Sequence, residues 1–189
     1  MRLVASFIAC SEDGYIATPE GDLSFLDRAA LAGEDYGYAA FKATVDTVFV
    51  GRKTYDKVTS LGFPDPHPEC VLVVFSRQPQ PDHWPNDGRR LWTSTNPVEW
   101  VKAELQRPGK DLYCDGGAEL LHQILQAGLV GRWIITTVPV RLGSGISLLD
   151  HPNRLSDFTL EATTHYPNGV VQRTYAKKTE RSLNPRAPR

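Results

Sequence analysis

Asp46-Thr-Val-Phe-Val-Gly-Arg-Lys-Thr-Tyr55 is the stretch that decides the fold of this sequence. Its first half is short, apolar and β-branched, which is typical of a strand buried on both faces of a parallel sheet. Gly51 then lets the backbone turn, and a short helix is expected from Arg52. N–H groups at a helix start favour an anion, and Arg52 and Lys53 add positive charge. The stretch therefore predicts either a phosphate site over Gly51–Thr54 or an ordinary strand-to-helix turn.

A second stretch, Asp115-Gly-Gly-Ala-Glu-Leu120, has the same design. It joins a strand-like run to a helical one, and its two glycines leave room for a pyrophosphate at the helix N-terminus. It does not match the G-x-G-x-x-G pattern of the ordinary Rossmann fold. In an open sheet, ligands bind where such turns gather at the carboxyl ends of strands. Two such turns in one small chain therefore favour a ligand site at this edge of the sheet more than either turn does alone.

Ser76-Arg77 forms a third candidate, directly after the strand-like run Cys70–Phe75. A hydroxyl and a guanidinium at a strand end can hold a ribose phosphate, because arginine matches phosphate geometry with two parallel hydrogen bonds. The alternative is a solvated loop arginine.

The rest of the chain alternates between strand-like and helical patterns, and then changes character. Asn168-Gly169 is a strong turn signal between two alternating runs, so it predicts a C-terminal antiparallel hairpin. Two proline-rich segments, 63–68 and 78–90, suit loops near a binding cleft, or plain surface linkers. The pattern as a whole predicts a mixed α/β sheet with helices on both faces. The expected strands are 3–10, 46–50, 70–75, 112–114, 133–138, 158–164 and 170–177, and the expected helices are 34–43, a short one after Arg52, 97–107 and 118–127.

Length and composition limit the class of protein. A chain of 189 residues is predicted to form one domain over residues 1–178, since domains average about 150 residues. Residues 179–189 are expected to be a disordered or weakly ordered tail. With 41% hydrophobic residues and a net charge of −1, the chain is globular and has no electrostatic reason to bind nucleic acid or an anionic membrane. No apolar run is long enough to span a bilayer.

Cysteine and histidine give no metal-binding pattern. Cys10, Cys70 and Cys114 have no ligand spacing, and each lies in or beside a strand-like run, so reduced core thiols of a cytoplasmic protein are expected. The five histidines are scattered, with no pair at ligand spacing, and no metal is expected.

Six motifs in order resemble the dihydrofolate reductase-like superfamily. The similarity is greatest to the branch with the reductase domain of the bifunctional riboflavin-biosynthesis deaminase–reductase and stand-alone bacterial proteins of this fold. The resemblance covers residues 2–178. The motifs are S-x-D-G-x-I (11–16), V-x-V-G-R-K-T-Y (48–55), S-R (76–77), D-G-G-A-x-L (115–120), G-L-V (128–130) and P-V-x-L-G-x-G-I-x-L-L (139–149).

The resemblance implies an eight-stranded, mainly parallel sheet with an antiparallel C-terminal hairpin, and NADPH as cofactor. Residues that match the family by position would contact successive parts of that cofactor. Those expected at the phosphates are Gly51, Arg52, Lys53 and Thr54, and those at the ribose 2′-phosphate are Ser76 and Arg77. The pyrophosphate turn would comprise Asp115, Gly116, Gly117, Ala118, Glu119 and Leu120, and Ala9 and Ile16 would flank the nicotinamide.

The substrate side departs from true dihydrofolate reductases. Those enzymes place an acid on the helix before the G-R strand, and here that position falls near Gly37 or Tyr38, with Asp35 about one turn earlier. Asp35, Tyr38 and Thr137 are the candidate catalytic residues, with Thr136 as the alternative register for the threonine. Dihydrofolate is accordingly not the expected substrate.

The function that follows is an NADPH-dependent reductase, which transfers a hydride to a small pteridine-like or pyrimidinone-like heterocycle. Two alternatives stay open. One is the pyrimidinone-phosphate reductase of riboflavin synthesis, for which Arg28 is a candidate phosphate contact. The other is a nucleotide-binding protein without turnover. A homodimer is the expected assembly, with a small-molecule substrate as the other partner.

Overall fold

The structure, a computed structural model, describes residues 2–85 and 87–178. The chain divides into two compact units: the first contains residues up to Phe7 and Ala32–Val130, and the second contains Ile8–Leu31 and the chain from Gly131 onward. The predicted tail, 179–189, lies outside the described residues. The single domain over 1–178 stays a prediction.

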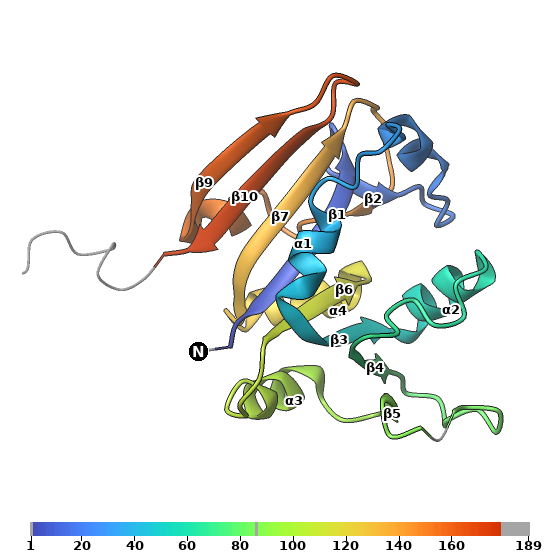
Figure 1. Ribbon diagram of the computed structural model, residues 1–189. Coiled ribbons are helices and arrows are strands. Elements are labelled where there is room, and N and C mark those ends of the chain that lie inside the picture. Colours follow the sequence, from blue (N-terminus) through green and yellow to red (C-terminus); the bar gives the residue numbers. More distant parts are fainter. Residues whose placement is uncertain (1, 86, 179–189) are drawn as a thin grey trace, which may run out of the picture. The chain divides into compact units, whose positions relative to one another are not determined.

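Strands β3 (Val45–Gly51), β4 (Val71–Phe75), β5 (Arg90–Thr93) and β6 (Asp111–Gly116) belong to the first unit (Figure 1). Together with the first half of β1 (Val4–Ser11) they lie in the order β5-β4-β3-β6-β1, and all neighbours are parallel. The edge strand β5 was not predicted, because Arg90–Thr93 is short and has no clear alternation.

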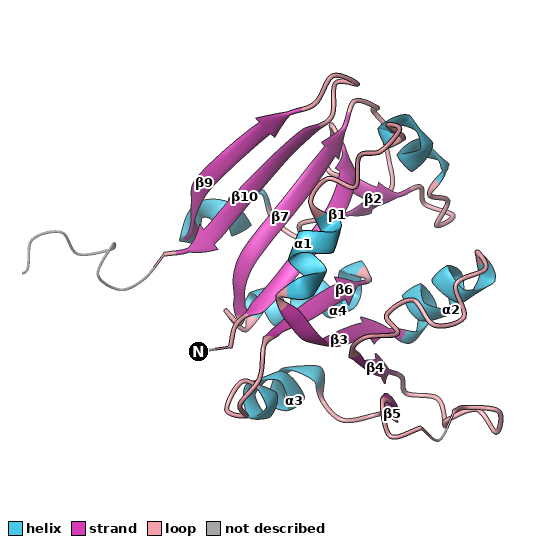
Figure 2. Ribbon diagram, viewed as in Figure 1, coloured by secondary structure: helices cyan, strands magenta, loops and turns pink. Residues whose placement is uncertain are grey.

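The second unit holds the antiparallel strands (Figure 2). β10 (Val171–Lys177) pairs with β7 (Val130–Val138) on one side and with β9 (Phe158–His165) on the other. The predicted C-terminal hairpin is therefore confirmed. β2 (Tyr15–Ala17) and β8 (Ile146–Ser147) form a separate short pair that the sequence did not predict, and two 3₁₀ helices cover Ser24–Ala29 and Pro152–Asp157.

Within the described residues, the main sheet has eight strands in the order β5-β4-β3-β6-β1-β7-β10-β9. This order confirms the predicted mainly parallel sheet with antiparallel C-terminal strands.

Helices α1 (Tyr38–Ala43) and α3 (Pro97–Glu104) cover opposite faces of the parallel strands. Val48 and Tyr113 are register partners, so their side chains share a face, and Phe49 points to the other. Phe41 of α1 packs on Tyr113 with ring centroids 5.0 Å apart, whereas Trp100 of α3 packs on Phe49 at 5.9 Å. Helices on both faces are thus confirmed.

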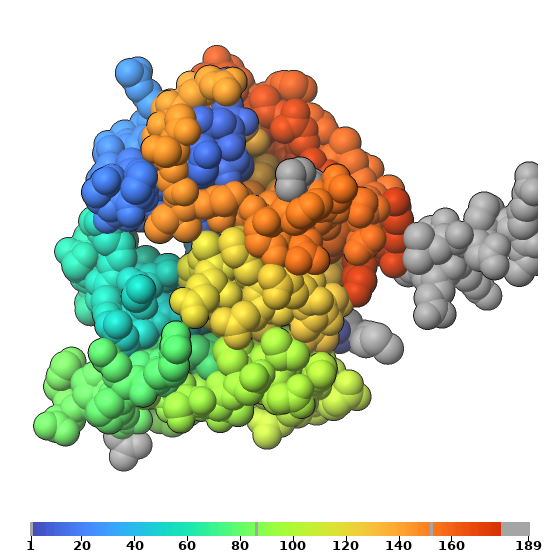
Figure 3. Space-filling view, turned by 180° about the vertical axis from the view of Figure 1, so that it is seen from behind, coloured from blue at the N-terminus to red at the C-terminus, as the bar shows by residue number. Residues whose placement is uncertain are grey.

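Helices α2 (Arg52–Ser60) and α4 (Ala118–Gln126) follow the two glycine turns, as predicted. α4 buries its apolar stripe and packs beside α3, as the space-filling view shows in yellow and green (Figure 3). Helix α1 is shorter than the predicted 34–43, because Tyr36 and Gly37 adopt left-handed backbone angles, with φ of 57° and 77°. An α-helix cannot continue through such residues.

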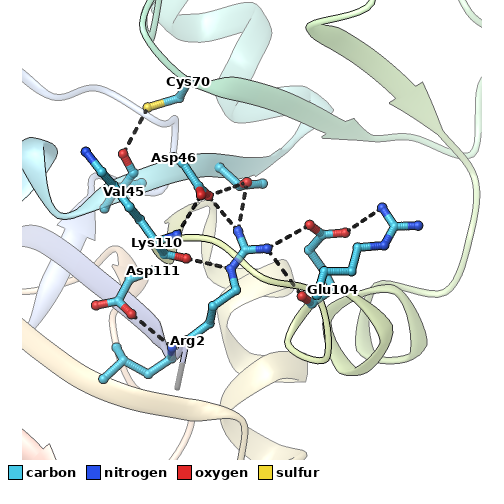
Figure 4. A network of polar contacts seen from close by, with 10 residues as sticks. Arg2, Val45, Asp46, Cys70, Glu104, Lys110 and Asp111 are labelled. Atoms are coloured by element: carbon cyan, nitrogen blue, oxygen red, sulfur yellow. Dashed lines mark hydrogen bonds and ion pairs between the residues drawn. The ribbon is translucent and has the colours of Figure 1, made fainter.

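A buried arginine links residues at the amino ends of the parallel strands β3 and β6 (Figure 4). The side chain of Arg2, which is 4% exposed, forms ion pairs with Asp46 at 2.5 Å and Glu104 at 3.0 Å, and its Nε donates to the carbonyl of Lys110. Asp111 accepts a hydrogen bond from the N–H of Leu3. These contacts hold the start of the chain against β3, α3 and β6.

Candidate functional site

The two glycine turns of the first unit touch each other. A Cβ on Gly51 would lie 3.7 Å from the carbonyl oxygen of Gly116 and 3.7 Å from the nitrogen of Gly117. A Cβ on Gly117 would lie only 2.6 Å from Oγ1 of Thr54. Gly116 has a φ of +95°, which favours glycine. The turns therefore form one surface of backbone at the carboxyl ends of β3 and β6, as the sequence predicted.

Both turns lead into helices that no side chain caps. Gly51 is the N-cap of α2 and Gly117 is the N-cap of α4, and neither helix has a side-chain hydrogen bond at its start. Helix α3 differs, since Asn96 accepts hydrogen bonds from the N–H groups of Val98 and Glu99. The first N–H groups of α2 and α4 lack such side-chain acceptors, and this arrangement suits an anionic ligand.

Ser76 and Arg77 lie at the end of β4, which is the neighbour of β3. Ser76 is buried, and its hydroxyl accepts a hydrogen bond from the N–H of Gln78, so it shapes the turn. The side chain of Arg77 is 92% exposed, and its guanidinium lies 3.4 Å from the carboxylate of Glu119 in α4. An exposed pair of this kind is weak, so Arg77 can exchange Glu119 for a ligand phosphate.

The other predicted cofactor residues differ in their surroundings. Arg52 forms an ion pair of 2.5 Å with Asp56 one turn along α2, while Lys53 is exposed. Leu120 is buried in the core, so it supports the turn through packing. The first unit contains all twelve residues predicted to contact the cofactor phosphates: Gly51, Arg52, Lys53, Thr54, Ser76, Arg77, Asp115, Gly116, Gly117, Ala118, Glu119 and Leu120.

Asp35 and Tyr38, two of the candidate catalytic residues, have different surroundings. Asp35 is exposed, and its carboxylate accepts hydrogen bonds from the N–H groups of Gly37 and Ala39, which lower its pKa. Asp35 therefore stabilises the start of α1. Tyr38 packs on Phe7 with ring centroids 5.3 Å apart, and burial together with the negative charge of Asp115 raises the pKa of its hydroxyl, which stays protonated.

Asp115 has buried partners that the sequence did not indicate. Its carboxylate lies 3.1 Å from Nε2 of His67, and Nδ1 of that ring lies 3.0 Å from the ammonium of Lys42. His67 belongs to the proline-rich segment 63–68, for which the sequence predicts either a loop near a binding cleft or a surface linker. No local pattern could have linked His67 with Asp115, because 48 positions separate them.

Ala9, Ile16 and Thr137 belong to the second unit. Ala9 lies in β1, Ile16 in β2 and Thr137 in β7. A hydrogen bond with Thr137 lowers the pKa of the Cys10 thiol, but burial has the larger effect and raises that pKa to about 11. Thr136, the alternative in register, is buried and accepts a hydrogen bond from Gln172 at 3.0 Å.

Two motifs of the resemblance meet within the second unit through Asp13. Its carboxylate accepts hydrogen bonds from the hydroxyl of Ser11 at 2.6 Å and from the N–H groups of Leu142 and Gly143 at 3.1 and 2.8 Å. The pairing of β2 with β8 continues this contact. Asp13 thus joins the 11–16 loop to the 139–149 loop.

In residues 2–85 and 87–178, no group of three or more His, Cys, Asp and Glu side chains could hold a metal ion. Over the same ranges, no helix has both the length and the apolar character needed to cross a membrane.

Comparison with known proteins identifies the family. The family model of the RibD C-terminal domain matches residues 2–172. The uncharacterized protein YwjB of Bacillus subtilis (strain 168) is 34% identical over 174 residues, which cover 89% of this chain and 95% of YwjB.

Two solved structures show the same fold. A protein of Shewanella sp. PV-4 assigned to riboflavin biosynthesis is 25% identical, with a TM-score of 0.80, and 94% of this chain and 99% of that one are covered. Dihydrofolate reductase of Enterococcus faecalis, solved with NADP(H), is 17% identical with a TM-score of 0.66 over 94% of this chain and 97% of its own. These findings confirm the resemblance drawn from the six motifs, and the chain belongs to the RibD C-terminal domain family.

Proposed function

We propose that the protein is an NADPH-dependent reductase of a small heterocycle. The observation that carries this proposal is the pair of uncapped glycine turns, 51–54 and 115–120, which meet at the ends of β3 and β6. A Cβ at Gly117 would crowd this surface, so the backbone there suits close approach of a pyrophosphate. Membership of a reductase family and the fold of an NADP(H)-bound dihydrofolate reductase support the same ligand.

The protein's own groups would bind and orient the cofactor. N–H groups at the starts of α2 and α4 would donate hydrogen bonds to the pyrophosphate, and Arg77 and Lys53 would add charge for the 2′-phosphate. The bound cofactor would supply the hydride. Tyr38, which burial keeps protonated, would contribute a hydrogen-bond donor on the substrate side. A pteridine-like or pyrimidinone-like acceptor is the proposed substrate, and cytoplasmic location and a homodimer are part of the proposal.

The test of cofactor choice compares NADPH with NADH. NADPH should bind more tightly, and Arg77→Ala should weaken it by about 10–150-fold through loss of a charge-assisted hydrogen bond, with little effect on NADH. Arg107→Ala is the matched control, because Arg107 is an exposed arginine three residues after the end of α3 and its side chain pairs only with Glu104 in the contacts described. Equal affinity of the wild type for both cofactors would contradict the 2′-phosphate assignment.

The test of turnover uses the absorbance of reduced nicotinamide with a panel of acceptors. Pteridines and ribosylated pyrimidinone phosphates are the two classes to compare, and preference for the latter would place the protein with the riboflavin-pathway reductases. A second candidate, a nucleotide-binding protein without turnover, is favoured by the exposed, capping position of Asp35. It predicts tight NADPH binding without oxidation by any acceptor.

A further inference from the structure

A chain of three polar side chains runs through the first unit towards the Gly116–Gly117 turn. Lys42 comes from α1, His67 from the loop before β4, and Asp115 from the end of β6. The ammonium of Lys42 lies 3.0 Å from Nδ1 of His67, and Nε2 of the same ring lies 3.1 Å from Oδ2 of Asp115. His67 is only 3% exposed, so this contact is part of the interior.

Lys42 and Asp115 determine which atoms donate and which accept hydrogen bonds at His67. An ammonium only donates and a carboxylate only accepts. Nδ1 of His67 therefore accepts from Lys42, and the tautomer assigned by these partners carries its proton on Nε2 and donates it to Asp115. Both ring nitrogens of a buried imidazole are satisfied in this way, with a positive group at one end and a negative group at the other.

The loop that carries His67 is itself held in place. Nη1 of Arg89 donates to the carbonyl oxygens of His67 and Cys70 at 3.1 and 3.0 Å, and the same guanidinium pairs with Asp65. The ring of His67 packs edge-on against Tyr113, with centroids 5.8 Å apart. His67 is thus a fixed support against which the Asp115 side chain rests.

Asp115 immediately precedes the glycines that form the backbone surface of the candidate cofactor site. Glycine has more backbone freedom than any other residue, so a Gly-Gly segment needs an external anchor to keep one conformation. We propose that Lys42 and His67 are positioning residues that hold Asp115, and through it the 115–117 turn, in the shape that binds the dinucleotide. This inference rests on the proposed cofactor and adds residues that act without touching it.

The experiment compares two substitutions of one residue. His67→Gln keeps an amide that can accept from Lys42 and donate to Asp115, whereas His67→Leu removes both roles. We expect His67→Leu to raise the NADPH dissociation constant about tenfold or more, and His67→Gln to stay within about threefold. Lys42→Met, which leaves His67 in place, should weaken binding by an intermediate factor and serves if His67→Leu does not fold.

Two further measurements separate positioning from stability and from the cofactor assignment. Asn96→Ala removes the α3 cap, so it should lower the melting temperature without changing NADPH affinity. Amide hydrogen exchange of residues 115–119 in the cofactor-free protein should become about tenfold faster in His67→Leu than in His67→Gln.

Equal NADPH affinity in wild type and His67→Leu, or equal losses in the leucine and glutamine variants, would overturn the positioning role. A different result separates the two proposals. If the wild type does not bind NADPH but amide exchange of the turn is faster in His67→Leu, the proposed cofactor is overturned and the positioning role stands.

Discussion

Gly117 shows at the residue scale how little space the candidate cofactor site leaves for a side chain. A Cβ at this position would lie 2.6 Å from Oγ1 of Thr54, a distance that requires one of the two residues to move. We expect Gly117→Val to abolish NADPH binding while the far-ultraviolet circular dichroism of the protein is retained. Thr54→Ala should partly restore the stability of Gly117→Ala by removing the clashing hydroxyl. A Gly117→Val protein that binds NADPH normally would reduce this glycine to a purely structural role.

Asp13, also at the residue scale, should make the stability of the protein depend on pH. Hydrogen bonds from Ser11 and from the N–H groups of Gly143 and Leu142 lower its pKa to about 2, against about 3.9 in an unfolded chain. Because the folded pKa is the lower one, the stabilisation is fully present above about pH 4 and is lost as the pH falls towards about 2. Asp13→Asn should therefore lower the melting temperature near neutral pH, and the difference from wild type should vanish in acid.

The control for this measurement is Glu20→Gln, which neutralises an exposed carboxylate in the same unit. Its melting temperature should follow wild type over the whole pH range. If Asp13→Asn also followed wild type, the contact between the 11–16 and 139–149 loops would not depend on the carboxylate.

Arg2 acts at the scale of elements, because its buried guanidinium joins the segment before β1 to β3 and α3 (Figure 4). Its side chain is 4% exposed, with Glu104 at 14% and Asp46 at 38%. Arg2→Met would remove the buried charge partner of Glu104 and leave it only the exposed Arg107, and we expect a loss of about 3 kcal/mol in the free energy of unfolding. Urea unfolding measures this loss. Lys102→Met breaks an exposed pair on the same helix and should cost below about 0.5 kcal/mol.

The cysteines give a prediction for the whole molecule. Cys10, Cys70 and Cys114 are free and buried, and burial raises the pKa of Cys10 to about 11 and that of Cys114 to about 12. Thiolates are the reactive form, so a thiol reagent near pH 8 should modify the native protein slowly and the urea-unfolded protein at once. Rapid modification of one thiol in the native state would reveal local opening around it. The burial of all three confirms the prediction that they are core thiols.

Among the described residues, Asp35 is the candidate for the acid that dihydrofolate reductases use, and its carboxylate lies in solvent and accepts hydrogen bonds at the start of α1. We expect dihydrofolate turnover with NADPH to be absent or very slow. Asp35→Asn should lower the melting temperature slightly without affecting reduction of any true substrate. Efficient dihydrofolate turnover that collapses in Asp35→Asn would show that this carboxylate reaches the substrate.

The sequence by itself determined the features that depend on near neighbours. The apolar runs before Gly51 and Gly116 predicted buried parallel strands, Asn96-Pro97 predicted the start of α3, and Asn168-Gly169 predicted the C-terminal hairpin. These features are local, because periodicity, capping and turn geometry act over a few residues. The two glycine turns were found in the same way, and their contact follows from the rule that parallel strand ends meet at one edge.

Only the tertiary structure decided which distant side chains became partners. The sequence left His67 as one of five scattered histidines, yet packing brings it to Asp115 and Lys42. The left-handed angles of Tyr36 and Gly37 delay α1, so the carboxylate of Asp35, a catalytic candidate by position, accepts a hydrogen bond at the start of this helix. Such pairings depend on how the elements pack, since a side chain's partner is set by position in space and no periodic pattern encodes it.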